Sequence, residues 1–229
     1  MLAINPGRLI NKYVPDYVVF DLETTGLSYK KDEVIEISAL KVIGGQIVDQ
    51  FSTLVDPGRH IPYTASSVNG IVDEMVQGCP SFEEALGSFL EFAGDMMLVG
   101  HNVKCFDLCF LYRDAMKFWG KTIGNDYVDT VILARAYLPD MSHALGDLAL
   151  YYDISTEGAH RALADCHMTY QVFEKLKCEM EHPSASLTVK WCPRCGNLLR
   201  KRSGKFGEFW GCGSFPECRY TEDVIINQK

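Results

Sequence analysis

The sequence lacks any apolar run that approaches the roughly 18 uninterrupted residues of a membrane-spanning helix. Its first residues, Met1-Leu2-Ala3-Ile4-Asn5-Pro6, lack the basic start and apolar core of a secretion signal. Internal repeats and low-complexity segments are absent as well, which excludes repeat architectures. These absences predict a cytoplasmic protein that has no membrane partner.

Disulfide bonds of a secreted protein are not indicated, although the chain has nine cysteines. Their number is odd, and Cys192, Cys195, Cys212 and Cys218 all fall within the last forty residues. The other five lie among apolar neighbours, where free cysteine behaves as a small buried hydrophobe. This pattern predicts a reducing, intracellular setting. These five are Cys79, Cys105, Cys109, Cys166 and Cys178.

The net charge of −8 argues against a nucleic-acid partner for the chain as a whole, but the charge is uneven. From Ser184 onward there are eight Lys or Arg and four Asp or Glu, against 14 and 26 in the preceding part. Contact with a polyanion is therefore expected mainly at the C-terminal end.

A chain of 229 residues with 47% hydrophobic content can bury one ordinary core and leave length for a small second module. The segment Pro183-Ser184-Ala185-Ser186 has the composition of a linker. We therefore expect a main domain over 1–181, a linker over 182–189 and a C-terminal module over 190–229.

The main domain shows strand patterns first and helix patterns later. Strands are expected over 17–22, 34–43 and 46–55, and Gly44-Gly45 is a hairpin signal between the last two. Ser81 and Glu84 have the spacing of a capping box at the start of a helix. This order predicts an α/β fold with a mixed sheet. Further elements are a strand over 96–99 and helices after Gly100, from about Asp129, over 144–151 and from about Arg161 to Glu181.

Asp21 and Glu23 are the most informative residues of the main domain. They end the apolar run Tyr17-Val18-Val19-Phe20 and, at alternate positions of a strand, project to the same side. Two carboxylates buried together without a counter-charge would cost several kcal/mol or more. A divalent metal ion is the simplest cation to expect beside them.

Two later segments supply further candidate ligands. Asp107 follows Gly100-His101-Asn102 and is surrounded by apolar residues, where a surface carboxylate is unexpected. Asp165 lies in the first turn of a helix with a mostly apolar stripe. His160 cannot share a helical face with Asp165, because five residues turn by about 500°. We expect it in the preceding loop, over the site.

These segments, in this order and spacing, resemble the DEDDh, or DnaQ-like, family of 3′-to-5′ exonucleases, which includes the proofreading subunits of bacterial replicative polymerases. The resemblance covers about 14–177. It implies a ribonuclease H-like fold with helices flanking the mixed sheet. It also implies that four acids bind two divalent metal ions and that His160 is the general base. The four acids are Asp21, Glu23, Asp107 and Asp165.

Carboxylate ligands suit hard ions such as Mg²⁺ or Mn²⁺, and two such ions stabilise an in-line displacement at phosphorus. Histidine has an ordinary pKa near 6.5 and can accept a proton from an attacking water. The expected products are nucleoside 5′-monophosphates from a 3′ end. The turn after the first strand is expected to shape the pocket for the terminal nucleotide, through Thr24, Thr25, Gly26 and Leu27, with Asn102 and Phe106 as further substrate-binding residues.

Other interpretations of single residues remain open. Asp107 taken alone fits a helix cap or an ion pair with Arg113. Asp129 fits an accessory acid or the N-cap of the next helix, and Gly26 also fits a simple strand-terminating turn. Asn102 and Phe106 are separated by three residues, where the commonest family form has two.

The C-terminal module contains Cys192-Pro193-Arg194-Cys195 and, further on, Cys212 and Cys218. Two thiolates separated by two residues can hold one edge of a tetrahedral Zn²⁺ site. The stretch from about Trp191 to Thr221 resembles the Cys₄ zinc finger of bacterial type I topoisomerases, including Gly211-Cys212 and Phe215-Pro216-Glu217-Cys218. The resemblance implies a zinc ribbon that holds one structural Zn²⁺ and binds single-stranded DNA.

Cationic and aromatic residues alternate in this module. Aromatic faces stack on unpaired bases, and the cations add a salt-dependent attraction to the backbone. A structural role in packing around the zinc is the alternative for about half of the aromatics, and a protein-binding ribbon is a further alternative. The residues expected to bind substrate are Arg200, Lys201, Lys205, Phe209 and Trp210.

Together these features predict a metal-dependent 3′-to-5′ exonuclease, a phosphodiester hydrolase, that acts on single-stranded DNA. An exoribonuclease of RNA maturation or turnover is the alternative, because the same core serves both polymers. A catalytically silent, polymerase-associated binding module is a third hypothesis. The expected partners are single-stranded nucleic acid, DNA before RNA, and a DNA polymerase or repair protein.

Overall fold

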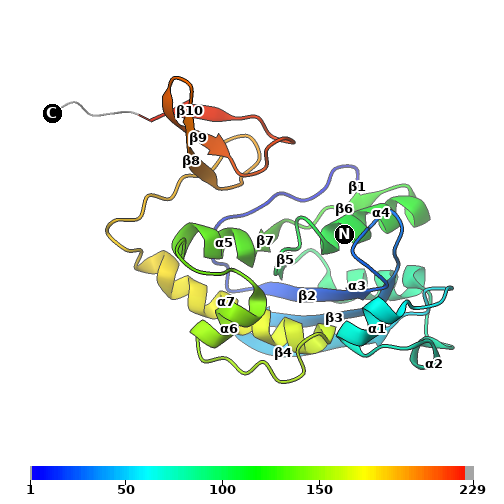
Figure 1. Ribbon diagram of the computed structural model, residues 1–229. Coiled ribbons are helices and arrows are strands. Elements are labelled where there is room, and N and C mark those ends of the chain that lie inside the picture. The colour runs from blue at the N-terminus through cyan, green and yellow to red at the C-terminus, as the bar shows by residue number, and fades with distance from the viewer. Residues whose placement is uncertain (1, 225–229) are drawn as a thin grey trace.

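A computed structural model describes residues 2–224 (Figure 1). Its main feature is a five-stranded mixed sheet in the order β4-β3-β2-β5-β7. Strand β2 pairs antiparallel with β3 and parallel with β5, which in turn pairs parallel with β7. The strands are β2 (Tyr17–Thr24), β3 (Val34–Ile43), β4 (Gln46–Leu54), β5 (Met97–Gly100) and β7 (Tyr127–Asp129).

Helices pack on both faces of this sheet. Phe20 of β2 packs on the face covered by α3 (Phe82–Ala93) and α4 (Asp107–Trp119). Tyr17 and Val19 pack on the other face, with side chains from three further helices. Because side chains alternate along β2, Asp21 and Glu23 belong to that second face. Its helices are α5 (Thr130–Tyr137), α6 (Leu145–Tyr151) and α7 (Ala162–Glu181).

The expected α/β order is confirmed, and the three N-terminal strands lie within one residue or two of their predicted ends. Ser81 and Glu84 form the predicted capping box at the start of α3. The short elements α1 (Tyr63–Asn69), α2 (Asp73–Val76), β1 (Leu2–Ala3) and β6 (Thr122–Ile123) were not expected. Strand β7 was anticipated only as an apolar lead into α5.

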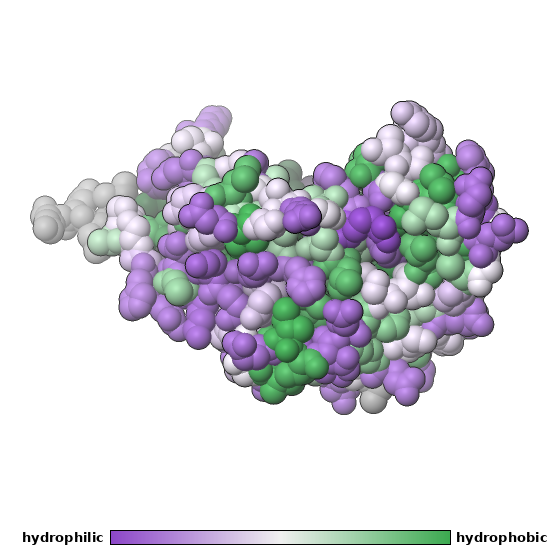
Figure 2. Space-filling model, turned by 90° about the horizontal axis from the view of Figure 1, so that it is seen from below, coloured by the Kyte–Doolittle hydropathy of each residue, from purple (hydrophilic) through white to green (hydrophobic). Residues whose placement is uncertain are grey.

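Strand β4 is an outer strand of the sheet, and its first half is exposed. Ile47 and Val48 are among its exposed side chains. On the face seen from below in Figure 1, hydrophobic residues lie exposed among hydrophilic ones (Figure 2). In the described part of the chain, no helix combines the length and the apolar character that crossing a membrane requires.

A second sheet follows the segment 183–190 and lies beyond α5 (Figure 1). It has three antiparallel strands in the order β10-β9-β8, formed by Leu199–Gly204, Gly207–Cys212 and Thr221–Asp223 as β8, β9 and β10. The Lys104 ammonium donates a hydrogen bond of 2.8 Å to the Ser214 hydroxyl. The Asn11 amide donates to the Gly196 carbonyl. The small sheet is thereby connected to the main domain.

Candidate active site

Three of the four predicted acids meet at the carboxyl end of β2. One carboxylate oxygen each from Asp21, Glu23 and Asp165 can be chosen so that all lie within 4.8 Å of one another. Asp21 and Glu23 come from β2, and Asp165 comes from the first turn of α7. All three are half-buried. Their oxygen donors fit a hard divalent cation.

Asp107 is the fourth predicted acid, and it lies outside this 4.8 Å group of described residues. It is the first residue of α4 and is buried. Its carboxylate accepts a hydrogen bond of 3.2 Å from the backbone N–H of Leu22, which separates Asp21 from Glu23 on β2. Arg113 pairs with Glu33 and Asp114 instead of Asp107. Asp107 is therefore held beside β2 and next to the acidic group.

Burial and mutual repulsion raise the pKa values of these carboxyl groups. Burial and then the charge of Asp107 raise the pKa of Asp21 well above its usual range. Burial raises the pKa of Glu23 to about 8, against a hydrogen bond from Asn69. Burial also raises the pKa of Asp107 to about 7. A divalent cation among these groups would offset the repulsion and favour the ionised forms.

His160 lies in the loop before α7, as expected. Its side chain is exposed, and its backbone has a positive φ of 68°. The backbone N–H of His160 donates a hydrogen bond of 3.4 Å to the Asp165 carboxylate. Burial raises the pKa of Asp165, whereas this hydrogen bond lowers it. His160 is therefore held next to the acidic group while its ring stays accessible to a ligand.

The turn that contains Asn102 is organised by Asp129. The Asp129 carboxylate accepts hydrogen bonds from the N–H groups of Asn102 and Lys104, at 3.1 and 3.0 Å. It also accepts from Val131 N–H as the N-cap of α5. Of the two interpretations of Asp129, an accessory acid or a helix N-cap, the structure therefore supports the N-cap. Phe106 packs on the Phe110 ring, with centroids 5.2 Å apart.

The turn after β2 holds its own residues in place. The Thr24 hydroxyl donates to the Gly26 carbonyl, and the Thr25 hydroxyl accepts from Glu33 N–H. A Cβ at Gly26 would lie 2.6 Å from the Asp32 carboxylate, so a larger residue here would have to displace the Asp32 side chain. Leu27 is 88% exposed. A large apolar side chain so placed is available to contact a ligand.

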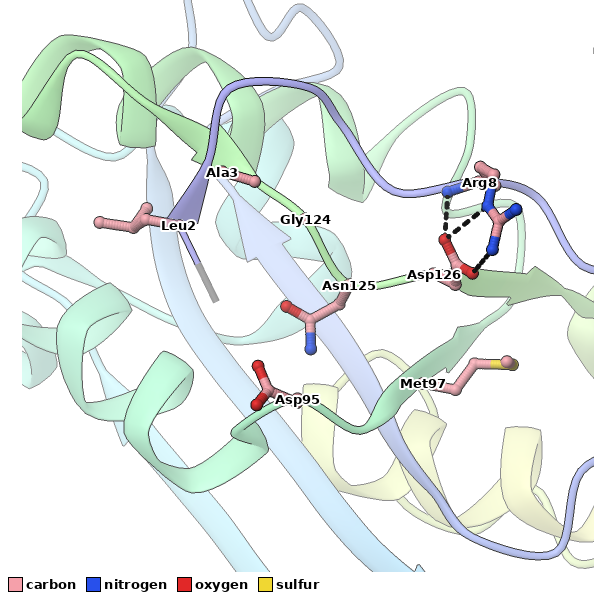
Figure 3. A pocket seen from close by; sticks show the side chains of 8 residues that line it. All are labelled: Leu2, Ala3, Arg8, Asp95, Met97, Gly124, Asn125 and Asp126. Atoms are coloured by element: carbon pink, nitrogen blue, oxygen red, sulfur yellow. Dashed lines mark hydrogen bonds and ion pairs between the residues drawn. The ribbon is translucent and has the colours of Figure 1, made fainter.

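A cleft of about 500 Å³ adjoins the acidic group. Asp21 and Asp165 line it, together with His101, Asn102, Arg135 and His143. A separate hollow of about 550 Å³ lies near the amino ends of β5 and β7 (Figure 3). There Arg8 is paired with Asp126 at 2.8 Å. The first cleft is therefore the one that two of the predicted acids, Asp21 and Asp165, line.

Sequence reasoning missed three residues that support the site. The buried Asn69, at the end of α1, hydrogen bonds to Glu23. Glu36 of β3 lies directly opposite Glu23 in the sheet. The His101 ring contacts the Thr130 hydroxyl at 2.9 Å and the His143 carbonyl at 3.0 Å. The sequence did contain a signal for Glu36, because it is a charged residue within an otherwise apolar strand.

The four C-terminal cysteines form one cluster. Their sulfur atoms lie within 4.8 Å of one another, with 3.7 Å between Cys192 and Cys218 and 3.3 Å between Cys195 and Cys212. A tetrahedral zinc ion with Zn–S distances near 2.3 Å requires S–S separations of about 3.8 Å. The donor set and spacing fit a Cys₄ zinc site.

The predicted substrate-binding residues of the ribbon occupy different positions. Trp210 packs with the cysteine cluster, and the Lys190 ammonium lies 5.3 Å from its ring centroid. Lys201 pairs with Glu208 at 2.6 Å. Lys205 lies at the exposed tip between β8 and β9. Arg200 and Phe209 lie on the face of the sheet opposite Trp210, because side chains alternate.

Comparison with known proteins finds a matching family for both parts of the chain. A family model described as Exonuclease (RNase_T) matches residues 18–173. The chain belongs to this exonuclease family. A second model, described as a topoisomerase DNA-binding C4 zinc finger, matches residues 189–225. The expected DnaQ-like domain with a C-terminal topoisomerase-type zinc finger is thereby confirmed.

Relatives of this exonuclease domain include DNA polymerase III proteins. The chain is 43% identical over 182 residues to DNA polymerase III PolC-type of Clostridium perfringens, which covers 77% of this chain but 12% of the relative. It is 40% identical over 165 residues to DNA polymerase III subunit epsilon of Aquifex aeolicus, covering 72% of this chain and 81% of the relative. The chain thus spans only a small part of the PolC-type relatives.

Solved structures confirm the ribonuclease H-like exonuclease fold. Exonuclease X in complex with 5′ overhanging duplex DNA has a TM-score of 0.61 and 25% identity, over 75% of this chain and 96% of that one. Exonuclease I of E. coli in complex with single-stranded DNA has a TM-score of 0.62 and 16% identity, over 73% and 41%. The latter likeness concerns the fold alone.

Proposed function

We propose that this protein is a metal-dependent 3′-to-5′ exonuclease that removes nucleoside 5′-monophosphates from single-stranded DNA. The observation that carries the proposal is the group of Asp21, Glu23 and Asp165, whose carboxylate oxygens lie within 4.8 Å of one another. Asp21 and Asp165 of this group line a cleft. An exonuclease family model that spans most of the chain supports the same activity.

Asp21, Glu23, Asp107 and Asp165 would hold two Mg²⁺ or Mn²⁺ ions. When bound, such ions stabilise the charge on the attacking and leaving oxygens at phosphorus. Asn69 and the Leu22 N–H fix the orientation of Glu23 and Asp107 through their hydrogen bonds. The site's own residues thus set where the carboxylates lie before any nucleotide arrives.

His160 is the proposed general base. Its exposed ring lies on a loop attached to Asp165, at the edge of the acidic group. An imidazole there accepts the proton of the attacking water, a role that histidine commonly takes in catalysis. The turn from Thr24 to Leu27 is proposed to receive the terminal nucleotide, with Leu27 packing against its base. Asn102 and Phe106 are proposed to complete this pocket.

The zinc ribbon is proposed to capture the strand. Arg200, Lys201, Lys205 and Phe209 supply charge and an aromatic surface, whereas Trp210 acts mainly through packing. The names of the polymerase III relatives support a DNA polymerase as partner.

The first test is degradation of a 5′-labelled single-stranded DNA and of the RNA of identical sequence, with Mg²⁺ or Mn²⁺. A descending ladder on DNA, well ahead of RNA, is expected. Faster degradation of RNA would replace this proposal by an exoribonuclease. Intact 3′ ends on both polymers, with tight binding of the strands, would indicate a catalytically silent binding module. Asp165→Asn is the inactive control.

A further inference from the structure

Arg135 is a cation whose position the proposed chemistry does not explain. It lies in the last turn of α5, is exposed, and lines the cleft that contains Asp21 and Asp165. A cation at a helix C-terminus is favourable in itself, which explains why this position is cationic. It does not explain why the side chain lines the cleft. Among the ion pairs of residues 2–224, none involves Arg135. Its guanidinium is therefore available to an anion.

Arg200 of the ribbon lies near Arg135. Burial, followed by the charges of Arg135 and Arg202, lowers the pKa of Arg200. Arg200 likewise takes part in none of the ion pairs formed by the described residues. Arg200 lies on β8 of the small sheet, which Figure 1 shows next to α5, the helix that carries Arg135. The two guanidinium groups are thus within range of each other's charge, and neither forms an ion pair among the described residues. Such a pair is stabilised when an anion binds both.

One face of the ribbon continues from Arg200. The register of β8 and β9 pairs Arg202 with Phe209 and Arg200 with Gly211, so these residues share a face. A hollow of about 260 Å³ on this face is also lined by Phe215 and Arg219. Cationic and aromatic groups side by side suit the backbone and bases of an unpaired strand.

The ribbon is attached next to the cleft. Lys104 donates to Ser214 of the ribbon, and the N–H of the same Lys104 is bound by Asp129. Asp129 also holds Asn102, which lines the cleft, and caps α5, which carries Arg135. One carboxylate therefore connects the wall of the cleft, the helix of Arg135 and the attachment point of the ribbon.

We propose that Arg135 and Arg200 bind the phosphodiester backbone of a single strand where it leaves the cleft. The strand then continues over the ribbon face formed by Arg202, Phe209 and Phe215. This inference rests on the proposed function, because it takes the cleft as the place where the 3′ end lies. The proposal adds Arg135, a residue of the catalytic domain, to the residues that capture the strand. It also gives the bound strand one direction, from the acidic group toward the ribbon.

The test measures binding rather than cleavage, so that it can fail independently of the proposed activity. Full-length protein is titrated with fluorescent deoxythymidine oligomers, a trimer and a dodecamer, with Ca²⁺ and 3′-terminal phosphorothioate linkages to suppress hydrolysis. Arg135→Gln and Arg200→Gln are each expected to weaken dodecamer binding by about tenfold, as for a lost charge-assisted hydrogen bond. Each should also reduce the slope of log affinity against log salt by about 0.7.

The control variant is Lys175→Gln. It removes one exposed positive charge from α7, on the catalytic domain. It should bind the dodecamer as the wild type does. Arg135→Lys keeps the charge and should retain most of the salt slope. Melting temperature and zinc content verify that every variant is folded.

Two results would overturn the inference. In the first, Arg135→Gln and Arg200→Gln bind the dodecamer with wild-type affinity and salt slope. In the second, Lys175→Gln loses as much affinity as the arginine variants, so that only overall charge matters. Trimer binding should change less than dodecamer binding in Arg200→Gln, because a short strand ends before the ribbon. A wild type that binds strands but cleaves none would contradict the proposed function and leave the arginine pair standing.

Discussion

Arg161 donates two hydrogen bonds to Glu36, at 3.1 Å from Nε and 2.7 Å from a terminal nitrogen. The same Glu36 carboxylate accepts the N–H of Ala162, the first residue of α7. Glu36 is buried on β3 beside Glu23. One carboxylate therefore fixes the start of the helix that brings Asp165 to β2, without itself belonging to the proposed ligands.

Replacing Glu36 by Gln should impair activity without removing a proposed metal ligand. The charge-assisted bonds to Arg161 are weakened, which should destabilise the protein by about 1–3 kcal/mol and displace Asp165. We expect at least a tenfold lower kcat and a higher Mn²⁺ concentration for half-maximal rate. Glu33→Gln is the control, because it changes a more exposed carboxylate that also pairs with an arginine, Arg113. An unchanged metal requirement would limit Glu36 to stability alone.

Asp165→Asn should abolish cleavage and leave the domain folded. Asparagine has nearly the same size, but it removes one negative charge from a group in which repulsion raises several pKa values. Without added divalent metal, its melting temperature should be equal to or above that of the wild type. Cleavage of 3′ ends at the wild-type rate would contradict the ligand assignment.

The stability conferred by Mn²⁺ should increase with pH. The pKa of Glu23 is raised from 4.5 to about 8 in the folded protein, so the folded state binds protons that the unfolded state has released in this window. The free energy of unfolding of the metal-free protein therefore falls as pH rises from about 4.5 to 8. The difference in Tm between added Mn²⁺ and no added metal should widen by several degrees over this window. A constant difference would contradict the prediction.

Deleting the chain from Ser184 onward should weaken the binding of long single strands without slowing the hydrolysis of a single-nucleotide substrate. Affinity for long single strands should fall by tenfold or more, because the ribbon's cations and aromatic surface are removed. Hydrolysis of a p-nitrophenyl ester of thymidine 5′-monophosphate should stay within about twofold, since one nucleotide needs only the cleft. Unchanged affinity for long strands would remove the ribbon from substrate binding.

Cys195→Ser should release the zinc and unfold the ribbon. A serine hydroxyl is a poor replacement for a thiolate, and a module of this size has only a small apolar cluster to hold it together without the metal. Zinc content should drop from one per chain to nearly none, and proteolysis should begin within residues 190–224. Ala substitution at Cys109, which lies outside the cluster, is the control.

The sequence predicted most of the secondary structure because its signals are local. Period-two and helical patterns, the Gly44-Gly45 turn and the Ser81 capping box each depend on neighbouring residues. The acids could be singled out because a charged residue within an apolar strand needs a partner. The structure groups Asp21, Glu23 and Asp165 at β2, whereas Asp107 accepts a hydrogen bond from the Leu22 N–H outside this group.

What escaped prediction depends on contacts between distant segments. Asn69 reaches Glu23 only because α1 ends beside β2, and Glu36 holds Arg161 across 125 positions of sequence. Only the docking of the ribbon brings Arg200 within range of the charge of Arg135. No pattern within a short window carries such information, because it arises from the path of the whole chain.

The hydrogen bond between Lys104 and Ser214 attaches the ribbon beside the cleft. With the proposed binding, a strand long enough to reach from the acidic group to the ribbon would be held at two places, so it would stay bound while its end is shortened one nucleotide at a time. Once the remainder no longer reaches the ribbon, only the cleft would retain it, and dissociation would compete with the next cut. Digestion should therefore proceed without release down to a characteristic length and then leave short oligomers.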